Sequence, residues 1–173
     1  MMFIRPAEII NLLSQNFFLK PGDKIAEFGC GAGYFTLLLA EKVGPQGRVY
    51  AIDILADALE ETKELIQFYG YNNVSFLKSD VKNLPFEDSS FDVVYISQLL
   101  FQNEGYDKIL TEGLRILKPG GCLIILEPGK KISFIEGTPV GLDILKTFFE
   151  VRGKKINFEK RFDDNYYLIV VVK

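Results

Sequence analysis

Three glycines spaced two residues apart, Gly29, Gly31 and Gly33, form the part of the sequence with the clearest potential for ligand binding. They follow a short apolar segment and precede a helical pattern, and in an open parallel sheet the turn at this place binds nucleotide-like ligands. Glycine suits such a turn because it lets a ligand approach the backbone and tolerates positive φ angles. The dinucleotide fingerprint G-x-G-x-x-G needs its third glycine where this sequence has Tyr34. The pattern therefore favours a ligand with ribose and adenine over one with a pyrophosphate.

An acidic residue stands at the end of each of three predicted strands: Glu27, Asp53 and Asp80. An anion at Glu27 would repel phosphates but suits a cationic ligand, and S-adenosylmethionine carries both an ammonium and a sulfonium group. Asp53 ends the second strand, where a carboxylate can accept hydrogen bonds from ribose hydroxyls. Asp80 could accept a hydrogen bond from the adenine amino group, with the Val81 backbone N–H facing the ring. Ile54, next to Asp53, is assigned to the same cofactor-binding set.

Each of these features also has a plain structural interpretation. A Gly-x-Gly-x-Gly run after a strand can be only a tight turn, and an aspartate after an apolar strand is often a helix cap or an Asx turn. Their occurrence together at three consecutive strand ends favours a binding site. The predicted cofactor is S-adenosylmethionine, and neither a metal site nor a catalytic residue is assigned.

The composition excludes several kinds of chemistry. The 173 residues contain no histidine, which removes the Ser-His-Asp triad, and the two cysteines, Cys30 and Cys122, lie too far apart for the usual zinc motifs. The net charge of −3 argues against non-specific binding to nucleic acid. The basic residues of the C-terminal third are interpreted as solvated edges, with a docking patch as the alternative. The cysteine usage and the absence of a long apolar run or a secretory signal predict a cytoplasmic protein without a membrane span.

The elements that must position these residues alternate between helix and strand. Apolar residues recur at helical spacing in the ranges 6–18, 34–43, 56–69, 104–117 and 140–150. Short apolar runs that predict strands occupy 24–28, 48–54, 74–78, 91–97 and 122–127. A turn is predicted over 118–121, before the last of these strands.

The end of the chain has a different pattern. Residues 155–162 and 166–172 are two strand-like segments separated by a short polar connection, which predicts a hairpin. Strands joined by helices, with near-continuous apolar runs, predict a doubly wound α/β fold, in which a mostly parallel sheet has helices on both faces. The hairpin then contributes one antiparallel strand. We expect a single domain over residues 1–173.

With these motifs in place, the sequence resembles the class I S-adenosylmethionine-dependent methyltransferases over essentially its whole length. The stretches that carry the resemblance are Lys20–Phe35, Gly47–Asp53, Ser79–Phe86, Ser90–Val94 and Leu117–Gly121. Within the family, the sequence looks most like the small-molecule enzymes of the ubiquinone, menaquinone and sterol type, partly through Ile125–Gly129. The resemblance implies a seven-stranded sheet in the order 3-2-1-4-5-7-6, with strand 7 antiparallel.

The resemblance also implies roles for individual residues. The three glycines would line the cofactor, Asp53 would bind the ribose, and Asp80 and Val81 would hold the adenine. Ser97, at the end of the fourth strand, would present its carbonyl near the methionine amine. Glu27 would reach the same amine directly or through water.

The acceptor of the methyl group is left open by the sequence. The fourth strand lacks the Asn-Pro-Pro-Tyr motif of enzymes that methylate adenine or glutamine amino groups. Residues expected to face the acceptor or to act as a lid over it are Tyr34, Gln98, Gln102, Asn103, Phe3, Arg5 and Phe134. A small apolar or aromatic acceptor is the leading hypothesis. The alternatives are an RNA or protein acceptor and a cofactor-binding subunit that depends on a partner, and a homodimer is compatible with the sequence.

Overall fold

The computed structural model describes residues 5–131, 136–162 and 165–173. They form two compact units, the first ending at Val81 and the second beginning at Lys82. Phe3 and Phe134, expected as lid residues, lie outside the described residues. That residues 1–173 form a single domain stays a prediction.

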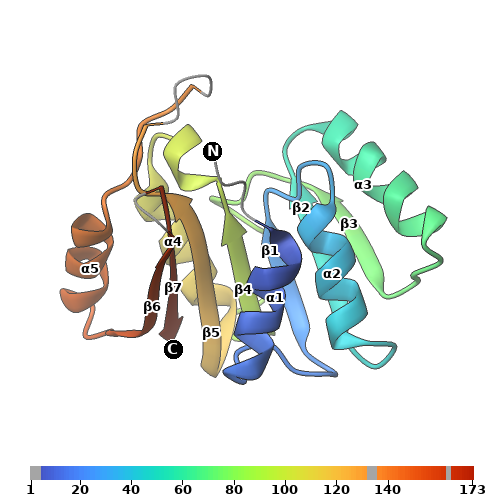
Figure 1. The fold of residues 1–173 in the computed structure, drawn as a ribbon, viewed down its shortest axis with the longest axis horizontal. Coiled ribbons are helices and arrows are strands. Elements are labelled where there is room, and N and C mark those ends of the chain that lie inside the picture. The colour runs from blue at the N-terminus through green and yellow to red at the C-terminus, as the bar shows by residue number, and fades with distance from the viewer. Residues whose placement is uncertain (1–4, 132–135, 163–164) are drawn as a thin grey trace. The chain divides into compact units, whose positions relative to one another are not determined.

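The first unit alternates helix and strand, as the sequence pattern predicts (Figure 1). Its described elements are α1 (Pro6–Gln15), β1 (Lys24–Phe28), α2 (Tyr34–Val43), β2 (Arg48–Asp53), α3 (Ala56–Phe68) and β3 (Val74–Lys78). Strand β2 pairs in parallel with β1 on one side and with β3 on the other. Because the three strands are parallel, the residues that follow them emerge at the same edge of the sheet.

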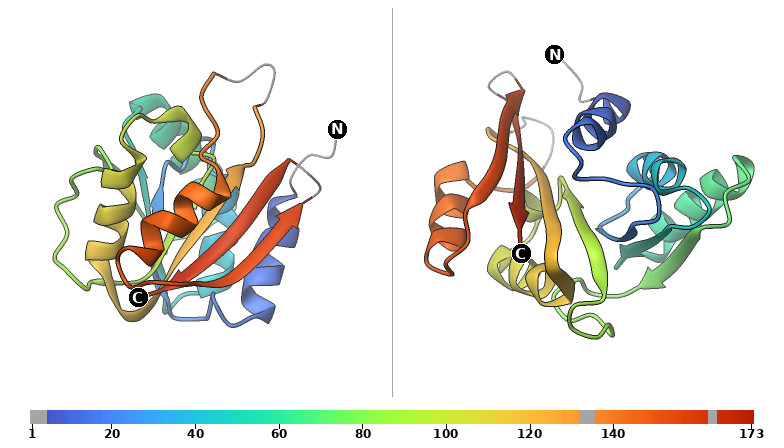
Figure 2. Two further views of the ribbon diagram at one scale, coloured as in Figure 1. Left: turned by 90° about the vertical axis from the view of Figure 1, so that its left-hand side faces the viewer. Right: turned by 90° about the horizontal axis from the view of Figure 1, so that it is seen from below.

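The second unit begins with a parallel pair of strands and ends with a hairpin. Its described elements are β4 (Phe91–Ser97), the 3-10 turn η1 (Leu100–Gln102), α4 (Tyr106–Ile116), β5 (Leu117–Pro128), α5 (Leu142–Glu150), β6 (Ile156–Phe162) and β7 (Tyr166–Val172). Strand β5 pairs in parallel with β4 and antiparallel with β7, and β7 pairs antiparallel with β6. Helices α4 and α5 lie on the same face of these strands (Figure 2).

All seven strands belong to one sheet with the order β3-β2-β1-β4-β5-β7-β6. This order and the antiparallel β7 confirm the predicted fold class. The apolar runs predicted the burial correctly, since Val93–Ile96 of β4 and Leu123–Leu126 of β5 are almost completely buried. Of the helices in the described part of the chain, none is long and apolar enough to span a bilayer.

The structure corrects some predicted boundaries. Helix α1 ends at Gln15 and not at residue 18, because Phe17 has a positive φ of 61°. Strand β5 begins at Leu117, so residues 118–121, predicted as a turn before it, belong to the strand. Gly121 explains this extension, since a Cβ atom there would lie 2.8 Å from the carbonyl oxygen of Asp92. Without a side chain at this position, β5 can approach β4 closely.

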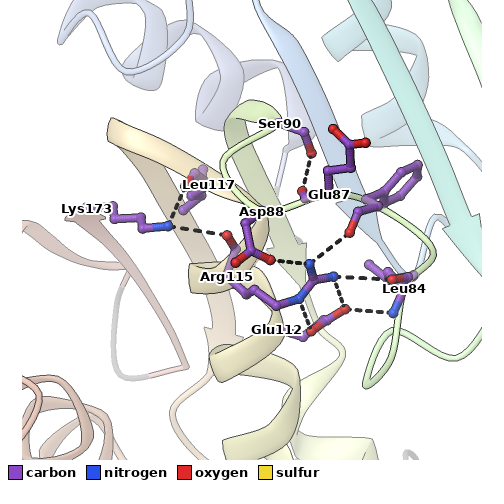
Figure 3. Close-up of polar contacts among 9 residues, drawn as sticks. Leu84, Glu87, Asp88, Ser90, Glu112, Arg115, Leu117 and Lys173 are labelled. Atoms are coloured by element: carbon purple, nitrogen blue, oxygen red, sulfur yellow. Dashed lines mark hydrogen bonds and ion pairs between the residues drawn. The ribbon is translucent and has the colours of Figure 1, made fainter.

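The connection from β3 to β4, residues 79–90, contains no helix, and none was predicted there. Residues 84–88 of this connection are held by Arg115 of α4 (Figure 3). The guanidinium donates to the carbonyl oxygens of Leu84 and Phe86 and to the Asp88 carboxylate, at 3.2, 2.8 and 2.7 Å. It also forms an ion pair with Glu112, whose carboxylate accepts a hydrogen bond from the Leu84 N–H at 2.7 Å. These bonds satisfy backbone groups that a helix would otherwise pair internally.

Candidate cofactor site

The glycine turn connects β1 to α2 and is held against the end of β2. The φ angles of Gly29, Gly31 and Gly33 are 75°, 53° and 82°, in a region that other residues rarely adopt. The carbonyl oxygen of Ile52 accepts hydrogen bonds from the N–H groups of Gly29 and Cys30, at 2.8 and 3.1 Å. The backbone path therefore requires the predicted glycines.

Two of the glycines have different surroundings. A Cβ atom at Gly31 would find no other atom within 4 Å, so open space lies beside the exposed backbone of this residue. A Cβ atom at Gly33 would lie 2.9 Å from Cγ2 of Thr62 on α3. The Thr62 hydroxyl donates a hydrogen bond to the Gly31 carbonyl at 2.8 Å. Gly31 thus leaves room for a ligand, whereas Gly33 lets α3 pack closely.

Asp53 ends β2 and contacts the glycine turn directly. Its Oδ2 accepts a hydrogen bond from the Gly31 N–H at 3.1 Å, and its Oδ1 accepts one from the Leu55 N–H at 3.0 Å. The second bond is the Asx turn that the sequence allowed as an alternative. A carboxylate has about four lone-pair sites, so both oxygens can accept further bonds from a ligand. Ile54 and Leu55 are exposed by 60% and 63% beside it, which places apolar surface next to the carboxylate.

Glu27 lies in β1 with only 3% of its surface exposed. Its Oε2 accepts a hydrogen bond from the Thr36 hydroxyl of α2 at 2.6 Å. Burial raises the pKa of this carboxyl to about 8, and the hydrogen bond from Thr36 opposes the rise, whereas the nearby charge of Asp53 adds to it. The sequence predicted an anion here, but burial favours the protonated form at pH 7 until a cation lies beside it.

Cys30 lies within the turn and has no predicted chemical role. Burial raises the pKa of its thiol to about 12, the neighbouring charge of Glu27 raises it further, and a contact of 3.6 Å from the Thr62 hydroxyl opposes the rise. Because the nucleophilic form of cysteine is the thiolate, this rise disfavours Cys30 as a nucleophile.

The other predicted residues of the first unit follow β3 or begin α2. Asp80 is exposed and Val81 is buried, and the N–H of the preceding Ser79 donates to the Asp53 carbonyl at 3.0 Å. This bond ties the exit of β3 to the end of β2. Tyr34 is 67% exposed at the start of α2.

Comparison with known proteins shows the family to which the chain belongs. Residues 19–150, most of the chain, match the methyltransferase domain family. The chain belongs to this family. A demethylmenaquinone methyltransferase of Geobacillus stearothermophilus is 34% identical to it over 116 residues, which make up 67% of this chain and 50% of that relative. The chain spans about half the length of the curated relatives it matches.

Solved structures share the fold of this methyltransferase domain. A SAM-dependent methyltransferase from Aquifex aeolicus has a TM-score of 0.82 at 22% identity, with 98% of this chain and 99% of that chain covered. A [4+2]-cyclase has a TM-score of 0.83 at 18% identity, with 96% of this chain and 80% of that chain covered. The fold therefore also hosts a reaction of another kind, so the activity must be argued from the site.

In the second unit of the methyltransferase domain, Ser97 ends β4. Its hydroxyl oxygen is buried and finds no hydrogen-bond partner among the described residues. A buried polar atom without a partner marks a place where a ligand or water can bind. The role predicted for the Ser97 carbonyl, at the methionine amine, stays a prediction.

Three residues with clear contacts were given no role by the sequence. Thr36 and Thr62 are completely buried, and the other buried residues of their helix faces are mostly apolar. A hydroxyl residue at an otherwise apolar position is the signal that could have identified them in the sequence. Glu127 is also completely buried, and its signal was an acidic residue at the end of an apolar run. Gln102 and Asn103 donate their side-chain amides to backbone carbonyls of the turn after β4, at 2.9 and 2.8 Å. That they face the acceptor stays a prediction.

Proposed function

We propose that this methyltransferase domain transfers a methyl group from S-adenosylmethionine to a small-molecule acceptor. The observation that carries the proposal is the geometry around Asp53. Its carboxylate is bonded to the Gly31 N–H at 3.1 Å, beside the open space at that glycine. A carboxylate fixed at the end of the second strand of a parallel sheet is suited to the two hydroxyls of a ribose.

The remaining residues of the first unit fit the same cofactor. Ile54 offers exposed apolar surface next to Asp53, as an adenine ring requires, and Asp80 and Val81 follow the neighbouring strand. Among the described residues of the first unit, the buried carboxyl of Glu27 has no cationic partner, and Thr36 is its side-chain hydrogen-bond donor. A ligand ammonium would supply that partner. We therefore assign the cofactor to these residues and the three glycines. The role of Ser97, in the second unit, stays a prediction.

S-adenosylmethionine, when bound, supplies an activated methyl group. The chain's own residues have to bind the cofactor and the acceptor and align the two. With the cofactor bound, a nucleophilic atom of the acceptor would supply the electron pair of its new bond to the methyl carbon, and the sulfur would keep the pair of the broken carbon–sulfur bond. The acceptor then loses a proton to solvent. Such a displacement depends on alignment and on exclusion of water, so it is compatible with a chain without histidine.

A small acceptor with a quinone-type ring is supported by the relatives described as demethylmenaquinone methyltransferases. The net charge of −3 is unfavourable for an extended nucleic-acid partner. We also propose a cytoplasmic setting, supported by the sequence, whose two cysteines lie far apart and form no CxxC motif.

The test is calorimetric titration with S-adenosylmethionine and with its demethylated product, S-adenosylhomocysteine. We expect the wild-type protein to bind both, and Asp53→Asn to weaken both at least about tenfold, because one acceptor oxygen is lost. Asp57→Asn is the matched control, since Asp57 is an exposed acid in the first turn of α3 and should leave the affinity unchanged. Absence of binding at millimolar ligand would refute the proposal.

A further inference from the structure

Gln98 follows β4 in a backbone conformation that glutamine rarely adopts. Its φ angle is 53°, and its N–H donates to the Leu126 carbonyl at 2.8 Å. Strained backbone of this kind persists only where surrounding contacts enforce it, and it gathers at functional sites. The contacts that enforce it here come from β5 and β7.

The first contact is the buried carboxylate of Glu127, near the end of β5. Its Oε1 accepts hydrogen bonds from the N–H groups of Leu99 and Leu100, at 2.7 and 2.8 Å, and its Oε2 accepts one from Phe101 at 3.3 Å. Three successive backbone donors therefore converge on one side chain. This arrangement fixes the turn directly after Gln98, and the Gln102 side chain closes it by donating to the Gln98 carbonyl at 2.9 Å.

The second contact is Tyr166, the first residue of β7, which lies opposite Pro128 at the end of β5. Its hydroxyl donates to the Gln98 side-chain oxygen, Oε1, at 3.3 Å. This bond orients the amide, so that its Nε2 atom is the end left for a further partner. Within the described part of the chain, no acceptor is found for the two N–H groups of Nε2.

We propose that Gln98 recognises an oxygen atom of the methyl acceptor through its Nε2 amide, with Tyr166 and Glu127 as positioning residues. The inference rests on the proposed function, and it deepens that function by naming a class of acceptor. An amide NH2 can only donate, so its partner must be a hydrogen-bond acceptor, such as a hydroxyl, phenolate or carbonyl oxygen on a ring. A hydrogen bond to such an oxygen holds the ring in place, and it strengthens where negative charge lies on the oxygen. A hydrocarbon acceptor without an oxygen or nitrogen atom would leave the donor unpaired.

The test is calorimetric titration of the protein, saturated with S-adenosylhomocysteine, with the probe 1,4-dihydroxynaphthalene under reducing conditions. We expect Gln98→Leu to weaken the binding of the probe about tenfold, and Tyr166→Phe and Glu127→Gln to weaken it by several-fold. The affinity for S-adenosylhomocysteine should stay the same in all three variants. A purely structural role would change the melting temperature and leave the affinity of the folded protein for the probe unchanged.

Tyr167→Phe is the matched control, since the hydroxyl of this neighbouring tyrosine is buried and donates to the Val140 carbonyl at 2.7 Å, away from Gln98. It should lower stability and leave the binding of the probe unchanged. If wild type binds S-adenosylhomocysteine but not the probe, or if Gln98→Leu binds the probe as wild type does, the inference is overturned. If wild type does not bind S-adenosylhomocysteine, the proposed function itself fails.

Discussion

The substitution Glu27→Gln tests whether burial controls the charge of this carboxyl. Burial raises its pKa to about 8, from 4.5 for an exposed glutamate. The folded protein therefore holds a proton on Glu27 over a pH range in which the unfolded chain has already released it. A group whose pKa is raised on folding contributes stability that is complete below the unfolded pKa and is lost as the pH rises through the folded pKa.

The size of the effect follows from the two pKa values. Between them, each pH unit lowers the free energy of unfolding by about 1.4 kcal/mol. From pH 5 to pH 7.5 the contribution of Glu27 should therefore fall by about 3 kcal/mol. Glutamine does not titrate, so the variant lacks this fall. The difference in stability between the variant and wild type should shift by the same amount, in favour of the variant at higher pH.

The assay is urea unfolding at equilibrium, followed by circular dichroism at half-unit steps from pH 5 to pH 7.5. Using the difference between two proteins removes the contribution of Glu127, whose pKa burial raises to about 7 in both. The control is Glu159→Gln, because the hydrogen bond and charge of Lys146 lower the pKa of Glu159. The stability that Glu159 contributes is lost only as the pH falls below about 4.5. The difference in the free energy of unfolding between the control and wild type should therefore stay constant over the tested range.

A constant difference between Glu27→Gln and wild type over this range would refute the reasoning. It would mean that Glu27 is already ionised at pH 5 in the folded protein, as an exposed carboxyl would be. The proton-linked binding of a cation at this residue would then have no basis.

Two further substitutions, Gly33→Ala and Arg115→Met, test how the turn and the loop before β4 are held, and Gly22→Ala is the comparison for the first. Gly33→Ala should destabilise the fold by about 2–4 kcal/mol, because a methyl group would lie 2.9 Å from a side chain of α3 at a φ of 82°. Gly22→Ala, at a φ of 88° in open space, should cost only the backbone strain of about 1 kcal/mol, and urea unfolding ranks the two. Arg115→Met should cost about 2 kcal/mol, since it leaves the largely buried Glu112 carboxylate without its cation. A urea midpoint equal to that of wild type would contradict this account of the loop.

Much of the fold could be predicted from local sequence patterns. The strand at 91–97 and the hairpin that ends in the strand from Tyr166 were predictable from the spacing of apolar residues alone. Strand and helix periods depend only on which neighbours along the chain are apolar. The predicted strand order rested on the family resemblance and is confirmed. The extension of β5 back to Leu117 could not be predicted, because it depends on how closely Gly121 approaches another strand.

The glycine turn and Asp53 were likewise predictable, since they follow the first two strands in sequence and parallel strands end at one edge. Only the tertiary structure decided what these residues do. It made Asp53 an acceptor for the Gly31 N–H, and it buried Glu27 against Thr36, which raises the pKa of the carboxyl. It also gave two nearby glutamines different partners. Tyr166 orients the Gln98 side chain, whereas the Gln102 side chain donates to the backbone. Charge state and orientation depend on burial and on partners distant along the chain, and spacing in the sequence carries no information about either.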